Sequence, residues 1–190
     1  MTNQFRPALV SVGLLTLLTG VLFPGIITGI AAVAFPHQAH GSLITKDGKV
    51  VGSALIGQAF TKPQYFQTRP SAAGSGYDGA SSSGTNLGPT SAKQKKSISD
   101  LADAYRKANG LAKDAPVPAD AVTSSASGLD PHISPENAKL QATRVAKARN
   151  KSVDDIQKLI ESNTEGRSLG FLGDPGVNVL KLNLALDTLK

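Results

Sequence analysis

The sequence contains no cysteine among its 190 residues, which excludes disulfides, thiolate metal ligands and a thiol nucleophile. Because cysteine-free proteins occur on both sides of membranes, this absence leaves the redox compartment open. Aromatic residues are scarce, at 5% of the chain, so few rings are available to stack on bases. The formal net charge is +6, and the basic run KQKK from Lys93 falls within an expected helix. We therefore expect a solvated face, or contact with anionic lipid or an acidic protein surface, and no nucleic-acid partner.

Several sequence motifs of nucleotide-binding, catalytic and metal-binding sites are also missing. No Gly-Lys-Ser/Thr follows the glycine-rich stretch Gly74–Gly88 or the serines near Ser127, which excludes a P-loop nucleotide hydrolase. The nucleophile elbow G-x-S-x-G is absent around Ser127, because a serine stands two positions before it. His37 and His40 form His-x-x-His, which lacks the spacing and the glutamate of the zincin motif. No metal site is therefore predicted.

One long segment carries no charge at all. Ala8–Phe35 reads ALVSVGLLTLLTGVLFPGIITGIAAVAF, and as a helix it would reach roughly 42 Å, more than the ~30 Å hydrocarbon core of a bilayer. A cleaved signal peptide is the alternative, because Arg6 supplies a positive start and Ala32-Val33-Ala34 resembles a cleavage site. Signal h-regions, however, are only ~7–15 residues long. The length favours an uncleaved membrane anchor.

Two features of this segment bear on its packing. Pro24 removes a backbone donor and predicts a kink, and Gly25-x-x-x-Gly29 predicts a flat face that a partner helix could approach closely. The alternative is that glycine is simply common in membrane helices. The orientation of the segment in the membrane stays open, because basic residues flank both of its ends. Arg6 precedes it, and Lys46 and Lys49 follow it together with an aspartate.

The remaining sequence mixes strand and helix signals. SLITKDGKVVGSALIGQ from Ser42 predicts a hairpin around Asp47-Gly48, and the Gly- and Ser-rich stretch Gly74–Pro89 predicts a long surface loop. Apolar residues at helical spacing predict a helix over Ser91–Asn109, ended by Gly110.

Two further helices and a strand are expected towards the C-terminus. Ser134 caps a helix that runs to about Arg149, and a second capping signal begins at Ser152. The alternation in VNVLKLNL, from Val177 to Leu184, predicts a strand with one buried face. Because there is no βαβ rhythm and no internal repeat, we expect one α+β domain over residues 37–190, after an anchor within residues 1–36.

The stretch VTSSASGLDPHIS, from Val122 to Ser134, admits three interpretations. Ser127, Asp130 and His132 could form a local hydrolytic site. A structural interpretation explains more residues, because Asp130-Pro131 favours a turn and Ser134 begins the next helix. The structural interpretation does not account for all the polar groups of this stretch. Those that remain could bind an anion such as a nucleotide phosphate, and they belong to Ser124, Ser125, Ser127 and Gly128.

Several separated stretches resemble one family, KdpC, the small C subunit of the bacterial Kdp potassium-transporting P-type ATPase. They follow the family's order and, with the single span, cover most of the chain: SALIGQAFTKPQYFQTRPSA (Ser53–Ala72), NLGPT (Asn86–Thr90), PVPADAVTSSASGLDPHISPENA (Pro116–Ala138), QATRVAKAR (Gln141–Arg149) and VNVLKLNLALD (Val177–Asp187). The resemblance implies a short N-terminus in the cytoplasm, one span of the bacterial plasma membrane, and a mixed α/β domain outside it.

The resemblance also implies a role. Members act as accessory subunits that assemble in the lipid bilayer with a potassium-translocating channel-like subunit and an ATP-hydrolysing P-type subunit. The family is described as a catalytic chaperone that raises the ATP affinity of the hydrolysing subunit, with the SSASG region compared to an ABC signature loop. This chain has no phosphorylatable Asp-Lys-Thr-Gly, so ATP is implied only through the partner. A domain outside the membrane would meet little ATP. The alternatives are an anchored hydrolase using Ser127, Asp130 and His132, and an external sensing domain.

Overall fold

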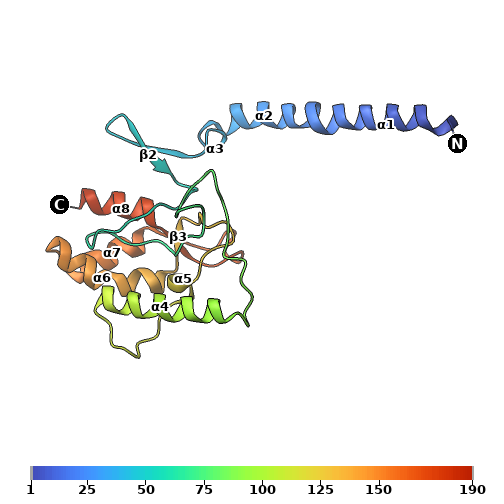
Figure 1. The fold of residues 1–190 in the computed structure, drawn as a ribbon. Coiled ribbons are helices and arrows are strands. Elements are labelled where there is room, and N and C mark those ends of the chain that lie inside the picture. The colour runs from blue at the N-terminus through green and yellow to red at the C-terminus, as the bar shows by residue number, and fades with distance from the viewer. Residues whose placement is uncertain (1, 190) are drawn as a thin grey trace. The chain divides into compact units, whose positions relative to one another are not determined.

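The computed structural model describes residues 2–189, which fall into two compact units that divide between Val51 and Gly52 (Figure 1). The first unit begins with the short 3-10 helix η1 (Thr2–Gln4), α1 (Phe5–Leu17), the π-helical turn η2 (Leu18–Leu22) and α2 (Phe23–Ala34). It continues with α3 (Pro36–Ala39), β1 (Leu43–Lys46) and β2 (Lys49–Ser53), whose last residues open the second unit. A single apolar helix is thus followed by mixed helix and sheet, as expected.

The apolar helix runs unbroken over Phe5–Ala34, and none of its most apolar window is buried in the described structure. Its 30 residues are long and apolar enough to cross a membrane. The kink expected at Pro24 stays a prediction, but the π-helical turn η2 lies just before it, and in this turn the Phe23 N–H reaches back to the carbonyl of Leu18. The proline ring would clash with the carbonyl of Gly20, four positions earlier, and a π-helical turn widens the helix at that point.

The predicted hairpin is confirmed, since β1 pairs with β2 across a two-residue turn. Asp47 has a φ of 51° and Gly48 a φ of 74°. Positive φ at both central positions matches the right-handed twist of the flanking strands and suits the Asp-Gly pair.

The second unit contains four longer helices and a small antiparallel sheet of order β3-β5-β4. Helix α6 contacts both α4 and α7, and α8 packs against α7 (Figure 1). The main core lies among α6, α7, α8 and the sheet, and a smaller cluster lies under α4 around Tyr105. The elements are α4 (Ala92–Asn109), α5 (Ala119–Val122), β3 (His132–Ile133), α6 (Pro135–Arg149), α7 (Val153–Ser162), β4 (Thr164–Glu165), β5 (Gly176–Asn178) and α8 (Val179–Thr188).

The three predicted helices are confirmed, as are the caps predicted at Ser134 and Ser152; the cap at Ser91 was not predicted. The hydroxyls of Ser91, Ser134 and Ser152 each accept a hydrogen bond from the backbone N–H three residues later, at the start of α4, α6 and α7. Gly110 ends α4 with a φ of 66°, in the left-handed region. These capping bonds satisfy N–H groups that a helix cannot pair internally, so the helices begin and end where the local sequence predicts.

The predicted strand over Val177–Leu184 is wrong beyond its first two residues. Strand β5 ends at Asn178, whose side chain accepts a hydrogen bond from the Lys181 N–H and starts α8. Val179, Leu182 and Leu186 then recur at helical spacing, and all three are buried. The alternation of apolar and polar residues from Val179 onward therefore belongs to the first turns of helix α8. The two-residue strands β3 and β4 and the single-turn helix α5 were not predicted.

The chain between β2 and α4 contains no helix or strand in the described structure, yet its middle is firmly held. Asn183 bonds both backbone groups of Phe66, at 2.9 and 3.0 Å, and Gln141 bonds both backbone groups of Gln67, at 2.8 and 3.1 Å. We call this arrangement the amide clamp. Arg144 and Arg149 add bonds to the carbonyls of Tyr65 and Gln64. The clamp satisfies backbone groups that elsewhere require a sheet.

Candidate functional site

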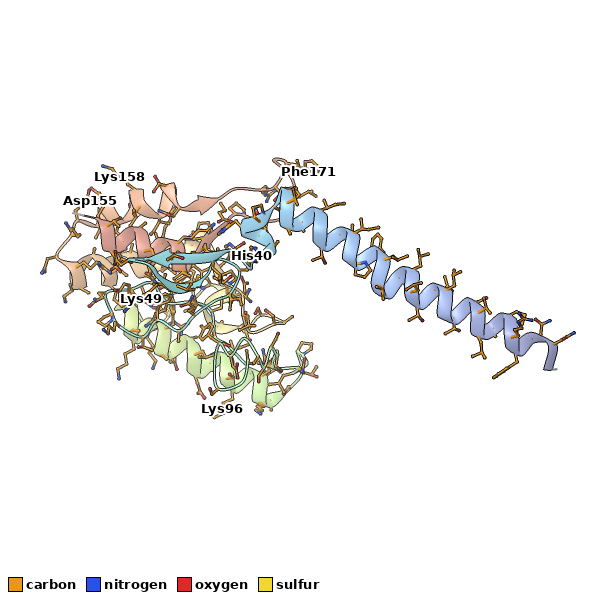
Figure 2. All side chains as sticks on the ribbon, turned by 90° about the horizontal axis from the view of Figure 1, so that it is seen from above. His40, Lys49, Lys96, Asp155, Lys158 and Phe171 are labelled. Atoms are coloured by element: carbon orange, nitrogen blue, oxygen red, sulfur yellow. The ribbon has the colours of Figure 1, made fainter. Side chains whose placement is uncertain are left out.

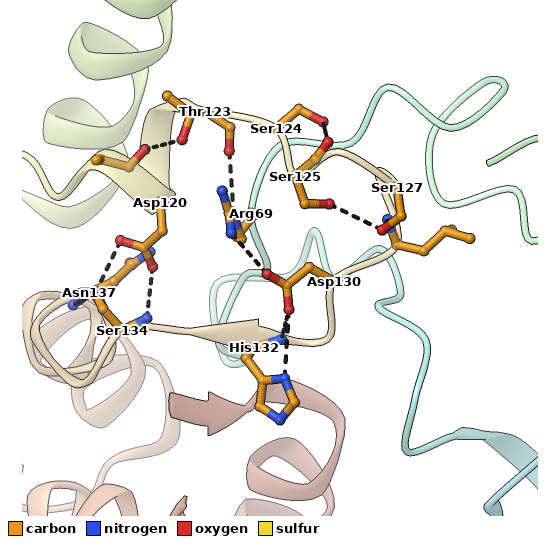
Figure 3. A network of polar contacts seen from close by, with 12 residues as sticks. Arg69, Asp120, Thr123, Ser124, Ser125, Ser127, Asp130, His132, Ser134 and Asn137 are labelled. Atoms are coloured by element: carbon orange, nitrogen blue, oxygen red, sulfur yellow. Dashed lines mark hydrogen bonds and ion pairs between the residues drawn. The ribbon is translucent and has the colours of Figure 1, made fainter. Parts of the chain in front are cut away.

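Polar side chains from distant parts of the second unit meet beside a cleft of about 470 Å³. Five of them form what we call the ion-pair chain, in which basic and acidic groups alternate: Arg69, Asp130, His132, Glu165 and Lys181. The serines of the SSASG stretch lie in the adjoining segment, residues 123–128, which we call the serine loop (Figure 3). Strand β3 presents His132, and β4 presents Glu165 from the other edge of the sheet.

Asp130 is the centre of the ion-pair chain. One carboxylate oxygen lies 2.8 Å from Arg69 Nη1, and the other accepts a hydrogen bond of 2.9 Å from the His132 backbone N–H. Burial alone would raise the pKa of this carboxyl, but hydrogen bonds from His132 and Arg69 outweigh it and lower the pKa to about 2. Asp130 is therefore ionised at neutral pH and fixes the start of β3.

His132 bridges two carboxylates. Its Nδ1 lies 3.6 Å from Asp130 Oδ1, and its Nε2 lies 3.4 Å from Glu165 Oε2. The hydrogen bond to Asp130 raises the pKa of His132, against burial, and the charge of Glu165 adds to the rise. A hydrogen bond of 2.8 Å from Lys181 in turn lowers the pKa of Glu165. When it is protonated, the imidazole joins strands β3 and β4 electrostatically.

The proposed hydrolytic trio is only partly brought together. Asp130 and His132 are neighbours, and Figure 3 shows Ser127 joined to neither of them. The other ring nitrogen of His132 faces Glu165, so neither nitrogen is paired with Ser127 in the described contacts. The Ser127 hydroxyl accepts a hydrogen bond of 3.1 Å from the Leu129 N–H and lies 3.4 Å from the Ser125 hydroxyl. A serine nucleophile needs a base within hydrogen-bond reach, and this arrangement does not supply one.

The serine loop is closed by two glycines. Gly128 has a φ of 68°, and a Cβ there would lie 2.5 Å from the carbonyl oxygen of Ser83. A Cβ on Gly84 would lie 2.9 Å from the carbonyl oxygen of Ala126. The serine loop therefore fits directly against the Gly- and Ser-rich stretch 74–89, which is mostly exposed as predicted but is fixed at Ser83 and Gly84.

Most polar groups of the serine loop are engaged within the fold. Ser124 donates to the carbonyl of Ser125, and the Gly128 N–H donates to the same oxygen at 3.3 Å. The Gly128 carbonyl accepts a hydrogen bond of 2.6 Å from Ser71. The four residues predicted to bind an anion do lie together: Ser124, Ser125, Ser127 and Gly128. Most of their polar groups, however, form hydrogen bonds within the fold. Nucleotide binding there stays a prediction.

Asp120 connects this region to α6. Its carboxylate accepts hydrogen bonds from the Ser134 N–H at 2.8 Å, the Ser134 hydroxyl at 3.0 Å and the Asn137 side chain at 2.9 Å. Asn137 in turn accepts a hydrogen bond of 2.8 Å from the hydroxyl of Tyr105, whose pKa is raised by burial. This network joins α4, α5 and α6.

Sequence reasoning missed Arg69, Asp120, Glu165 and Lys181. They occur in four separate stretches, and no local spacing relates them. Among the described residues, no group of three or more His, Cys, Asp or Glu side chains could hold a metal ion. In the first unit, added Cβ atoms on Gly25 and Gly29 would meet nothing within 4 Å, so that face of α2 is open. Its packing against another helix stays a prediction.

Comparison with known proteins places these features in context. Residues 5–188 match the family model described as KdpC, the K⁺-transporting ATPase c chain. The potassium-transporting ATPase KdpC subunit of Mycobacterium tuberculosis (strain H37Rv) is 54% identical over 189 residues, covering 100% of both chains. The KdpC subunit of Caulobacter vibrioides (strain NA1000 / CB15N) is 55% identical over 98% of this chain and 94% of its own. That of Methylococcus capsulatus is 53% identical over 100% of both.

Proposed function

This chain belongs to the KdpC family of K⁺-transporting ATPase subunits, and on that basis we propose that it is a non-catalytic subunit which stabilises the assembled transporter. The observation that carries the proposal is the family match over residues 5–188, which takes in both the apolar helix and the folded domain. Such a subunit would assemble with a potassium-translocating channel-like subunit and an ATP-hydrolysing P-type subunit.

The apolar helix supports a membrane-embedded role. Its side chains are almost all exposed, so in water it would leave about thirty residues of apolar surface unburied. We propose that it spans the bacterial plasma membrane with the N-terminus in the cytoplasm and residues 37–190 outside. Lipid would cover most of the helix, and the open face at Gly25 and Gly29 would receive a partner helix.

The geometry beside the cleft also supports a structural role for this subunit. His132 lies within ion-pair distance of a carboxylate on each side, and the Ser127 hydroxyl accepts a hydrogen bond within its own loop. The ion-pair chain connects Arg69, in the irregular segment between β2 and α4, with strands β3 and β4 and with α8. These are the contacts expected of a rigid docking domain rather than of a reacting centre.

Any effect on ATP use would then be a coupling across the membrane. The domain would rest on the outer mouth of the channel-like subunit, and its contacts would differ between transport states. In this scheme the subunit raises the ATP affinity of the hydrolysing subunit without touching nucleotide. The alternative, contact between ATP and the serine loop, predicts that Ser125→Ala and Ser127→Ala weaken binding of an ATP analogue to the isolated full chain.

The direct test is removal of the subunit from the complex. We expect the remaining subunits to co-purify poorly in mild detergent, with weaker potassium affinity and lower potassium-stimulated ATPase activity. If assembly, potassium affinity and ATPase activity were all unchanged, the proposal would be wrong. A hydrolytic activity of the purified chain that disappears in Ser127→Ala would instead favour an enzyme.

The role of the helix face has its own test. Gly25→Leu and Gly29→Leu fill the open face, and we expect each to reduce recovery of the assembled complex. Ala31→Leu is the matched control, since at about 100° per residue it lies on a different side of α2. Equal recovery of all three variants would show that this face does not pack against a partner.

A further inference from the structure

The loop between β4 and β5 ends in a small apolar protrusion. Leu169, Phe171 and Leu172 are 82%, 68% and 50% exposed, and we call these three residues the apolar tip. Figure 2 shows Phe171 at the outer edge of its loop. Three large apolar side chains within four residues rarely remain in water without a function.

The backbone of this loop is well defined. Ser168 and Leu172 exchange two hydrogen bonds of 2.9 Å, and an ion pair of 3.3 Å between Arg167 and Asp174 closes its base. Leu169 has a φ of 54° and Gly170 a φ of 83°. Asparagine or glycine normally occupies such positive-φ positions in a tight turn, and leucine is disfavoured there. Leu169 therefore has a strained backbone conformation in this turn, although its side chain is exposed.

None of the three side chains of the apolar tip belongs to a described core cluster. Leu169 and Phe171 line none of the described clefts, whereas Leu172, at the base of the turn, lines the cleft beside the ion-pair chain. Leu169 and Phe171, the two most exposed of the three, therefore project from the loop rather than line a groove. A projection of this kind suits a fluid apolar medium, which needs no matching shape, better than it suits a preformed pocket.

The chain itself brings such a medium within reach. The apolar helix ends at Ala34 and the second unit begins at Gly52, so residues 35–51 form the whole connection. Fully extended, they would span at most about 60 Å, and α3 and the β1–β2 hairpin shorten this considerably. With the helix in a bilayer, the tether keeps the second unit at a high effective concentration beside the membrane surface.

We propose that the apolar tip inserts into the lipid interface of the membrane that the apolar helix spans. The inference rests on the proposed membrane location of the helix. Leu169, Phe171 and Leu172 would enter the headgroup and upper acyl region, with the Arg167–Asp174 pair remaining at the water boundary. The second unit would then be held to the bilayer at two points and would have a fixed tilt.

The absence of tryptophan from the chain makes this directly measurable. Phe171→Trp and Leu169→Trp each place a single reporter at the apolar tip, on exposed positions. Each full-length variant is reconstituted in nanodiscs of phosphatidylethanolamine and phosphatidylglycerol. Lys158→Trp is the control, because Lys158 is exposed on α7 and stands apart from Phe171 in Figure 2.

We expect both tip reporters to show blue-shifted emission and a loss of emission when the lipids carry bromine near the headgroup end of their chains. The Lys158→Trp reporter should show neither effect. Water-exposed emission at the tip, or equal quenching at Lys158→Trp, would overturn the proposal. So would burial that appears only when the partner subunits are added and is insensitive to brominated lipid, which would identify a protein contact.

The same samples separate this proposal from the one on which it rests. Co-elution of the chain with nanodiscs reports membrane attachment by the apolar helix. A chain that co-elutes while its tip stays in water would contradict lipid insertion alone. A chain that fails to co-elute would contradict the membrane location itself.

Discussion

The side-chain amide of Asn183 bonds the backbone of Phe66 on both of its polar groups, across 117 positions of sequence. Both residues are buried, at 2% and 0% exposure, so water cannot replace either bond. This pair fixes an irregular segment against α8 in the way that a neighbouring strand would fix it in a sheet.

The first prediction concerns this pair. Asn183→Leu keeps the approximate volume but leaves the N–H and carbonyl of Phe66 without partners. Each buried unsatisfied group costs about 1–3 kcal/mol, so we expect the free energy of unfolding to fall by roughly 2–5 kcal/mol. Denaturant unfolding of the full chain in detergent measures this. Gln157→Leu, on the exposed side of α7, should change stability little, and a similar loss there would contradict the mechanism.

The second prediction concerns the serine loop. Gly128→Ala forces a Cβ to within 2.5 Å of the Ser83 carbonyl oxygen at a positive φ. We expect a loss of more than about 1 kcal/mol in the free energy of unfolding. Gly79→Ala is the control, because no atom lies within 4 Å of the added Cβ and its φ is not positive. If thermal unfolding showed both variants equally stable, the close fit at Gly128 would be wrong.

The third prediction is a pH dependence due to His132. Its folded pKa is raised above 6.5 by Asp130 and Glu165, so its contribution to stability is complete below 6.5 and is lost as the pH rises through the folded pKa. Unfolding measured from acid to alkaline pH should show this decline. His132→Gln should remove the decline, and Glu165→Gln should reduce it. An unchanged profile in His132→Gln would assign the pH dependence to other groups.

The fourth prediction concerns acid. The pKa of Asp130 is lowered from 3.8 to about 2, so its stabilising contribution is present above 3.8 and is lost as the pH falls towards about 2. We expect Asp130→Asn to be less stable at neutral pH and to lose less stability on acidification. Asp114→Asn, at an exposed loop position, should follow the unmodified chain throughout.

The sequence predicted what depends on neighbouring residues. The serine caps predicted at Ser134 and Ser152 and the Asp47–Gly48 turn depend on bonds within a few positions, and all are confirmed. The terminal segment was mistaken because VNVLKLNL fits both periods over so short a length. Only the packing of Leu182 and Leu186 decides for a helix.

The candidate site was harder to predict for a related reason. Asp130 and His132 are separated by a single residue and were identified together. Their other partners, Arg69, Glu165 and Lys181, come from segments whose proximity exists only after folding. The amide clamp could not be predicted from the sequence either, because a buried Gln or Asn has no spacing that distinguishes it from an exposed one.

The amide clamp also dictates an order of events during synthesis. Residues 63–69 leave the ribosome long before Gln141 and Asn183, the side chains that will bond their backbone. Until α8 has been translated, the segment around Phe66 has no permanent partner and must be kept from pairing with other chains. Completion of the domain therefore coincides with the arrival of its last helix, and a pause in translation before Asn183 prolongs the interval in which this segment is most prone to aggregate.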